Sequence, residues 1–185
     1  MNPPPESLHA DALSVLEAWQ APTPHQETLR ARFADHLRRN PDGVRRTCFP
    51  DHITAGTIVV STDGDQVLLN LHRRAQRWFA FGGHCEAGDA TLAGVALREA
   101  MEESGLGDLD FDPTPVSLDL HEVEFCDPRG TVRHLDVRYA ALASAGDGHA
   151  VSEESLDVRW WPITGLPELE EEMLELIMRA RTRMC

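Results

Sequence analysis

Hydrophobic positions recur with helical spacing in two segments near the N-terminus. Within residues 5–20 and 25–39 the apolar side chains return at steps of three and four, as Phe33 and Leu37 do. This spacing places them on one face of a helix. The intervening "APTP" contains two prolines, which interrupt helices. The pattern predicts a helical N-terminal extension over residues 1–45, and we expect it to pack on the main domain or on a second subunit.

The pattern then changes to runs that are typical of strands. "ITAGTIVVS" and "QVLLNLHR" are joined by the hairpin signal "TDGD". A helical segment at about residues 91–104 is followed by "VSLDLHEVEFCD" and "TVRHLDVRYAALAS", joined by the turn "DPRG". The short run "LDVRWWPI" precedes an amphipathic helix over residues 166–184. The order β-β-α-β-β-β-α predicts one α/β domain (α+β by some schemes) over residues 46–185, with a mixed sheet sandwiched between helices.

Composition narrows the class of protein and of partner. The 185 residues carry a net charge of −14, which argues against nucleic acid or an anionic membrane surface as the main partner. No apolar run approaches the length of a membrane span. The first residues lack the basic and apolar regions of a signal peptide, and the four cysteines form no CxxC pair. We therefore expect a cytoplasmic protein with free thiols.

Three glutamates gather in the stretch "GGHCEAGDATLAGVALREAMEESGL", residues 82–106. On a helix Glu99, Glu102 and Glu103 fall within an arc of roughly 100°. Such charges repel one another, and Arg98 can reach only Glu102 at the i,i+4 spacing. A solvated helix face explains the glutamates taken alone, whereas Mg²⁺ or Mn²⁺ would balance all three. Four apolar residues are expected to face the core from the opposite side: Ala93, Leu97, Ala100 and Met101.

Glycines frame this helix on both sides. Gly82 and Gly83 allow a backbone turn that other residues cannot make, and a carbonyl there can approach a metal directly. Asp89 or Thr91 is placed to cap the helix, and Gly105 is placed to end it. The stretch therefore predicts strand, loop, helix and stop, with carboxylates near the C-terminal end of the helix.

In this order the features resemble the sequence box of the Nudix hydrolase family. That box has a glycine, five residues, a glutamate, seven residues, and then R-E-(apolar)-x-E-E-x-G-(apolar). Gly83 matches the glycine, "REAMEESGL" matches every specified position of the second half, and the element order over residues 52–184 is also similar. One departure is that eight residues, not seven, precede Arg98 after Asp89. Either Asp89 replaces the first acid with a one-residue insertion, or Ala90 stands in its place and no acid does.

The resemblance implies hydrolysis of a pyrophosphate linkage. The substrate would be a nucleoside diphosphate derivative, such as a nucleotide sugar, a dinucleotide or a nucleoside triphosphate. The resemblance also implies Mg²⁺ or Mn²⁺ as cofactor, with Glu99, Glu102, Glu103 and the carbonyl oxygen of Gly83 as ligands. Such ions bridge phosphate oxygens and lower the pKa of an attacking water.

Catalytic roles follow from the same resemblance, with the base left open. It is either a box glutamate, Glu102 or Glu103, or an acid of the loop before the last strand, where Glu153 and Glu154 lie. A solvated loop is the alternative for the latter two. Arg98 is expected to orient a glutamate rather than touch the substrate.

Other candidates rest on weaker patterns. His134, Asp136 and Arg138 alternate with apolar residues and share one sheet face, which would be a substrate-binding wall or an exposed surface. Three tryptophans could stack on a base, although core packing is their commoner fate: Trp78, Trp160 and Trp161. A zinc site is conceivable from four residues whose spacing matches no standard finger: Cys48, His52, His84 and Cys85.

Two other functions remain open on the same fold. An isopentenyl-diphosphate isomerase-like enzyme would place a reactive cysteine just before the glycine–histidine step, where Phe81 and Gly82 stand here, with Cys85 after it. A non-catalytic nucleotide-sensing module would be expected to lose box glutamates, and none is missing. No mark downstream of the box identifies the substrate, and a homodimer through the N-terminal helices is possible.

Overall fold

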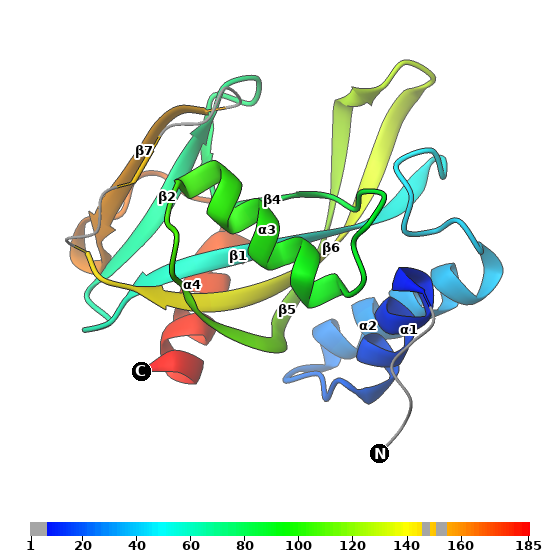
Figure 1. Cartoon of the computed structure of the whole chain (residues 1–185), viewed down its shortest axis with the longest axis horizontal. Helices are drawn as coiled ribbons and strands as arrows, with labels where there is room; N and C mark the ends of the chain where they lie inside the picture. Colours follow the sequence, from blue (N-terminus) through cyan, green and yellow to red (C-terminus); the bar gives the residue numbers. More distant parts are fainter. Residues whose placement is uncertain (1–6, 146–148, 151–154) are drawn as a thin grey trace.

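The computed structural model describes residues 7–145, 149–150 and 155–185. Figure 1 shows a sheet with helices on both faces and two further helices at one end. The helices are α1 (Leu8–Ala18), α2 (Pro24–Arg39), α3 (Leu92–Ser104) and α4 (Glu171–Met184). The strands are β1 (Asp51–Ser61), β2 (Gln66–His72), β3 (Arg77–Phe79), β4 (Phe81–His84), β5 (Asp110–Asp127), β6 (Gly130–Ala143) and β7 (Ser155–Pro162).

Strand β1 is the centre of the seven-stranded sheet. The main order is β3-β2-β1-β6-β5, with β4 paired to β1 and β7 paired to β2. Strand β6 runs parallel to β1 along its whole length. Strand β4 lies antiparallel to the first half of β1, and β2 to the second half. The predicted mixed sheet between helices is confirmed, with α3 and α4 on opposite faces (Figure 1).

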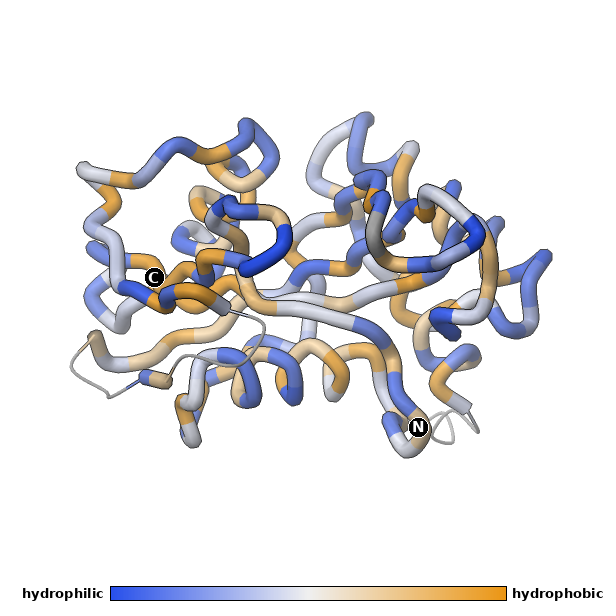
Figure 2. The backbone as a smooth tube through the Cα atoms, turned by 90° about the horizontal axis from the view of Figure 1, so that it is seen from above, coloured by the Kyte–Doolittle hydropathy of each residue, from blue (hydrophilic) through white to orange (hydrophobic). Residues whose placement is uncertain are grey.

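Side chains alternate between the two faces along β1, as a period of two requires. Ile58 and Val60 belong to the apolar cluster under α4. Val59 belongs to the cluster under α3, and the Thr57 hydroxyl donates to the Ala96 carbonyl of that helix. Figure 2 shows the backbone coloured by hydropathy, with hydrophobic and hydrophilic segments mixed along the chain. Strand β1 is therefore buried on both faces, and its residues divide between two layers.

The N-terminal helices pack against the domain, one of the two arrangements expected. Their apolar residues share a cluster with β1, α3, β5 and β6. The Gln26 side-chain amide donates to the Leu118 carbonyl at 2.9 Å and accepts from the Leu118 amide at 2.7 Å. It thus pairs with the backbone of the edge strand β5, which would otherwise offer free hydrogen-bonding groups. The domain boundary at residue 45 stays a prediction.

Two short strands, β3 and β4, lie outside the predicted order, and element boundaries differ most from the predicted ones at the starts of β5 and α4. Strand β5 begins at Asp110, six residues before the predicted run, and pairs with β6 across a register shift between Asp112 and Ser117. Prolines at 113 and 115 lie within this irregular stretch, and prolines inside a run argue against a strand. Helix α4 begins at Glu171 rather than at residue 166, because a 3₁₀ turn (Ile163–Gly165) and Pro167 precede it.

Candidate active site

The paired glycines lie inside a strand, so the predicted turn at this position is wrong. Gly82 and Gly83 belong to β4, opposite Gly56 and Ala55 of β1, and neither has a positive φ. A Cβ on Gly82 would lie 2.7 Å from the Cα of Gly56. A Cβ on Gly83 would lie 2.6 Å from the carboxylate carbon of Glu99. The glycines are needed for this close approach rather than for a turn.

Helix α3 has the predicted caps but a rotated buried face. Thr91 caps its start by accepting from the Gly94 amide, and Gly105, with φ of 70°, ends it. Met101, expected in the core, is 37% exposed, whereas Glu103 is 8% exposed. The buried stripe includes a carboxylate near its C-terminal end: Leu92, Val95, Ala96, Ala100, Glu103 and Ser104. Packing against β4 therefore draws Glu103 inward and leaves Met101 at the surface.

Glu103 is held against β4 by polar partners. The Gly82 amide donates to its Oε2 at 2.9 Å, and the Asn70 side-chain amide donates to its Oε1 at 3.4 Å. A backbone amide and a buried side-chain amide compensate part of the cost of desolvating this carboxylate. The structure thus places one box glutamate at a fixed point beside the glycines.

Arg98 holds the rest of the motif together. Its guanidinium donates to Glu99 at 2.9 Å and to Glu102 at 3.2 Å, the predicted i,i+4 contact. It also donates twice to Asp89, at 3.0 and 3.2 Å, and once to the His84 carbonyl at 3.1 Å. Hydrogen bonds to Asp89 raise the pKa of Arg98 further above its usual value. The N–H groups of Arg98 are thus engaged by three carboxylates and one carbonyl. This fits an orienting role and leaves few N–H groups to bind a substrate.

Asp89 lies in the loop before α3, within reach of Arg98. Its carboxylate pairs with Arg98 and accepts from the Glu86 amide at 2.8 Å, and Gly88 turns the loop with φ of 112°. Burial alone would raise the pKa of Asp89, but the hydrogen bonds and charge of Arg98 lower it overall. The extra residue before Arg98 is therefore accommodated in the loop, and an acid is present.

The donor set fits a divalent cation. Glu99 is mostly buried, and this burial raises its pKa against the opposing charge of Arg98. Glu102 is 61% exposed at its side chain. Together with Glu103 they form the carboxylate site (Glu99, Glu102 and Glu103), whose oxygens are hard donors with a single guanidinium among them. The Glu99 carboxylate lies directly against Gly83, at the place that a Cβ on this glycine would occupy.

A cleft of about 760 Å³ lies beside this site. Gly82, Gly83 and Glu103 line it. Five arginines line it together with four acids, Glu103 among them, so the cleft offers cationic groups to a polyphosphate as well as carboxylates; the arginines are Arg46, Arg73, Arg74, Arg77 and Arg138.

The three residues predicted to share a sheet face all line the cleft: His134, Asp136 and Arg138. Arg138 is 8% exposed and donates to Asp136 at 2.9 Å and to Asp119 at 2.8 Å. The Thr54 hydroxyl donates to the other oxygen of Asp136. The geometry makes this face a cleft wall rather than an exposed surface. Its role in substrate binding stays a prediction.

The three tryptophans considered for stacking on a base do not line the cleft. Trp78 packs edge-on to Trp161 in the apolar layer under α4, and Trp160 borders the layer under α3. None of the three lines the cleft, so core packing is their role in this part of the chain. Glu153 and Glu154 lie outside the described residues.

The four residues of the zinc candidate from the sequence are not brought together as one group of potential ligands in the described part of the chain. His52 and His84 do lie together, but their companions are Cys126 and His134. Cys85 packs against the apolar cluster on the α3 side, and burial raises the pKa of its thiol to about 12. Burial also raises the pKa of the Cys48 thiol, to about 11. Sequence spacing offers no signal for this group, because strand pairing across the sheet assembles it.

Burial keeps the three clustered histidines neutral. Desolvation, reinforced by neighbouring histidines and Arg46, lowers the pKa of His84 to about 4 and that of His134 to about 2. The pKa of His52 is lowered mainly by desolvation as well. Neutral imidazoles have a ring nitrogen that can accept a hydrogen bond or bind a metal.

Comparisons with known proteins agree with this architecture. The structure resembles a Nudix-family hydrolase from Clostridium perfringens with a TM-score of 0.56 at 21% identity, over 71% of this chain and 97% of that one. It resembles the Escherichia coli dihydroneopterin triphosphate pyrophosphohydrolase with a TM-score of 0.56 at 15% identity, over 71% and 95%. The Nudix domain of Shewanella oneidensis NrtR, in complex with ADP ribose, gives 0.51 at 23%, over 72% and 88%. At these identities the likeness shows the fold.

No curated protein sequence matches the chain. Within the described residues, no helix combines the length and apolar character that crossing a membrane requires. The family model described as NUDIX domain matches residues 50–180, well over half of the chain. The match includes the glycines of β4, the whole of α3 and the cleft wall on β6. The family predicted from the sequence is confirmed: this chain belongs to the Nudix family.

Proposed function

We propose that the protein is a metal-dependent hydrolase that cleaves the pyrophosphate linkage of a nucleoside diphosphate derivative. The observation that carries the proposal is the position of the carboxylate site. Glu103 and Glu99 are fixed against Gly82 and Gly83, at the edge of a cleft lined by arginines. Such a cleft attracts a polyphosphate, and carboxylates beside it supply the anionic ligands that a phosphate-bound cation needs.

Mg²⁺ or Mn²⁺ would be held by Glu99, Glu102, Glu103 and the carbonyl of Gly83. When bound, such an ion neutralises charge on the phosphate oxygens and makes a bound water more acidic. Arg98 acts as a positioning residue, because its contacts to Glu99 and Glu102 fix where their carboxylates lie.

The remaining chemistry is assigned to side chains of α3. Glu103, which lines the cleft, accepts the proton of the attacking water, with Glu102 as the second candidate. The water oxygen bonds to one phosphorus as the bridging P–O bond breaks. The departing phosphate keeps that electron pair. Arg138, held by two aspartates, keeps the cleft wall on β6 rigid.

Three features support a nucleotide derivative as the substrate class. The cleft volume of about 760 Å³ falls within the range of small-molecule sites. Phe79 in the cleft lining offers an aromatic surface. Structural neighbours include an ADP-ribose complex and a Caenorhabditis elegans Ap4A hydrolase with a TM-score of 0.51. A panel of ADP-ribose, dinucleoside polyphosphates, nucleotide sugars and nucleoside triphosphates covers this class.

The test is product release from that panel with Mg²⁺ for the native chain, Glu103→Gln and Glu99→Gln. Glu172→Gln, on the exposed side of α4, is the matched control. We expect turnover of at least one diphosphate by the native chain and by the control, and a strong loss in both site variants. Binding of nucleotides without turnover of any of them would support the sensing module instead.

The isomerase-like alternative has no support in the site. Gly82 occupies the position of the reactive cysteine, and the nearby Cys85 is mostly buried, with a pKa raised to about 12. A thiol that stays protonated is a poor nucleophile or base. Assembly as a homodimer and a cytoplasmic location stay part of the proposal. The four free cysteines accord with a reducing compartment.

A further inference from the structure

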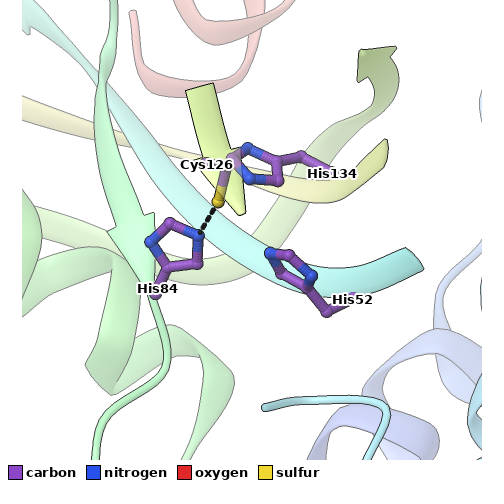
Figure 3. A group of neighbouring side chains, drawn as sticks. All are labelled: His52, His84, Cys126 and His134. Atoms are coloured by element: carbon purple, nitrogen blue, oxygen red, sulfur yellow. Dashed lines mark hydrogen bonds between the residues drawn. The ribbon is translucent and has the colours of Figure 1, made fainter. Parts of the chain in front are cut away.

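Four potential metal ligands converge at one end of the cleft, on the face of the sheet away from α3. His52 of β1 is paired in register with His134 of β6, and His84 of β4 lies opposite Thr54. Cys126 comes from β5, beyond a register shift that follows Val123. One ligand atom from each of His52, His84, Cys126 and His134 lies within 4.8 Å of the others. Figure 3 shows this histidine–cysteine cluster, with its side chains gathered from four strands.

The polar atoms of the cluster are incompletely satisfied within the protein. Nε2 of His52 and Nε2 of His134 are buried and have no hydrogen-bond partner. Buried polar atoms normally have one, so two such atoms facing the same point indicate a missing ligand. Nδ1 of His52 lies 3.2 Å from the Cys48 carbonyl, to which it donates. That bond leaves the lone pair on Nε2, as in metal sites where the outer hydrogen bond orients the imidazole.

The geometry is close to that of a bound ion. Cys126 Sγ lies 3.4 Å from His84 Nε2. Ligand bonds of about 2.0–2.3 Å would put neighbouring ligand atoms of a tetrahedron roughly 3.3–3.7 Å apart. The ring centroids of His52, His84 and His134 lie 5.0 to 5.2 Å from one another. Small side-chain rotations therefore complete a four-coordinate site.

We propose that His52, His84, Cys126 and His134 form a closed, structural zinc site that joins β1, β4, β5 and β6 at the end of the cleft. Three imidazoles and a thiolate are the donor types that select Zn²⁺ over the hard cations Mg²⁺ and Mn²⁺. Four protein ligands leave no open position, which is the mark of a structural site. His84, Cys126 and His134 line the cleft, so an ion has a route from solvent.

The side chains next to the histidine–cysteine cluster have hydrogen-bond partners of their own. His121 of β5 lies beside His134, at 5.3 Å between ring centroids, but its Nδ1 is paired with Asp119. Arg46 donates to the Cys126 carbonyl, which fixes the backbone next to the thiol. The proposal does not depend on hydrolase activity, since the ligands belong to another part of the cleft lining.

The first test uses the full-length chain stripped of metal and then titrated with Zn²⁺ in excess Mg²⁺. We expect one equivalent of Zn²⁺ to stay bound after gel filtration, as measured by elemental analysis. Co²⁺ in the same site should give the visible bands of tetrahedral cobalt and a thiolate-to-cobalt charge-transfer band. The triple variant Glu99→Gln, Glu102→Gln, Glu103→Gln should retain the zinc and the bands.

Single variants test each ligand. Cys126→Ser should abolish the charge-transfer band, and Cys126→Ser, His84→Gln and His134→Gln should each weaken Zn²⁺ binding by more than about 100-fold, beyond the effect of losing an outer-shell partner. Cys185→Ser and His121→Gln are the matched controls and should bind as the native chain does. Thermal unfolding of the metal-free variants checks that they fold, and His84, less buried than His52, provides the gentlest change.

Two results would overturn the proposal. One is failure of the stripped native chain to take up stoichiometric Zn²⁺ in the presence of Mg²⁺. The other is zinc uptake that the triple glutamate variant abolishes and the Cys126→Ser and His134→Gln variants leave unchanged, which would place the ion at the carboxylates.

Discussion

Gly83 and His84 are neighbours in the chain, yet they serve two different regions. Gly83 pairs with Ala55 and faces Glu99 of α3. His84 pairs with Thr54 and faces the histidine–cysteine cluster. The alternation of a strand sends adjacent residues to opposite faces. One short strand therefore contributes both to a carboxylate site and to a group of imidazoles and a thiol.

The two regions differ in the hardness of their ligands. The carboxylate site has oxygen donors and one arginine, which suits Mg²⁺ or Mn²⁺ beside a phosphate. The cluster has nitrogen and sulfur donors with unpartnered ring nitrogens, which suits Zn²⁺. Sorting by donor type would let two ions occupy one cleft without exchange. Experiments that remove one region should leave the other intact.

The largest expected effect is on turnover in the Glu103→Gln variant. Loss of a proton acceptor and metal ligand should lower kcat/KM by about 10²–10⁴-fold, because general-base catalysis contributes that much. Steady-state kinetics on the best substrate of the panel would measure it.

The zinc content of the same variant is the control. It should equal that of the native chain, since Glu103 lies outside the cluster. An unchanged kcat/KM would contradict the role of Glu103, and a parallel loss of zinc would contradict the separation of the regions.

The next largest effect is on stability when zinc is removed. An ion bound only to the folded state at about 1,000 times its Kd stabilises by about 4 kcal/mol. For a chain of this size that corresponds to a fall in Tm of roughly 8–16 °C on chelation. Calorimetry with and without Zn²⁺ would show it, and Cys126→Ser should abolish the difference. A Tm that responds equally to Mg²⁺ and Zn²⁺ would count against a selective site.

The contrast in ligands parallels a contrast in what the sequence could predict. Arg98, Glu99, Glu102 and Glu103 are within six residues, so helical geometry alone places them together. The caps at Thr91 and Gly105 also act within one turn of the helix and were predicted correctly. Local geometry thus predicts the part of the site that α3 carries from spacing.

The other features of the two regions depend on contacts between segments that are distant in the sequence. His52, His84, Cys126 and His134 meet only because β1 pairs with both β4 and β6, and β5 shifts register before Cys126. The burial of Glu103 instead of Met101 depends on how α3 rotates against β4. Gly82 and Gly83 were predicted as a turn because a glycine pair indicates flexibility, whereas here it indicates close packing with Gly56 and Glu99.

Two alanine substitutions separate packing from chemistry at these glycines. In Gly82→Ala the new Cβ meets backbone, 2.7 Å from the Cα of Gly56, so we expect a loss of about 1–3 kcal/mol in stability from overpacking. In Gly83→Ala it meets the end of the Glu99 side chain, which a side-chain rotation can displace at the cost of its contact to Arg98. There we expect a smaller loss of stability but a fall in kcat of about 10²-fold, because a ligand is displaced.

Denaturant unfolding and steady-state kinetics on both variants would test this pair. Equal losses of stability with equal losses of kcat would contradict the distinction between the two glycines. Zinc content should be retained in Gly83→Ala, because Gly83 faces Glu99 and its neighbour His84 is the residue that belongs to the histidine–cysteine cluster.

The smallest expected effect concerns the loop that carries the extra residue. Asp89→Asn removes the charge that pairs with Arg98 and should cost about 1–2 kcal/mol at neutral pH, since Arg98 keeps its contacts to Glu99 and Glu102. The pKa of Asp89 is lowered in the folded chain. Its contribution is therefore complete above the pKa of an unfolded aspartate, about 3.9, and disappears as the pH falls through the lower folded value.

Urea unfolding of the native chain and of Asp89→Asn from neutral to acidic pH would measure this dependence. The difference in unfolding free energy should be constant near neutrality and shrink only under strongly acidic conditions. A difference that is already lost above pH ~5 would mean that Asp89 is not held as a carboxylate by Arg98. The second alternative, in which no acid fills the first acidic position of the box, would then be favoured although Asp89 lies beside Arg98.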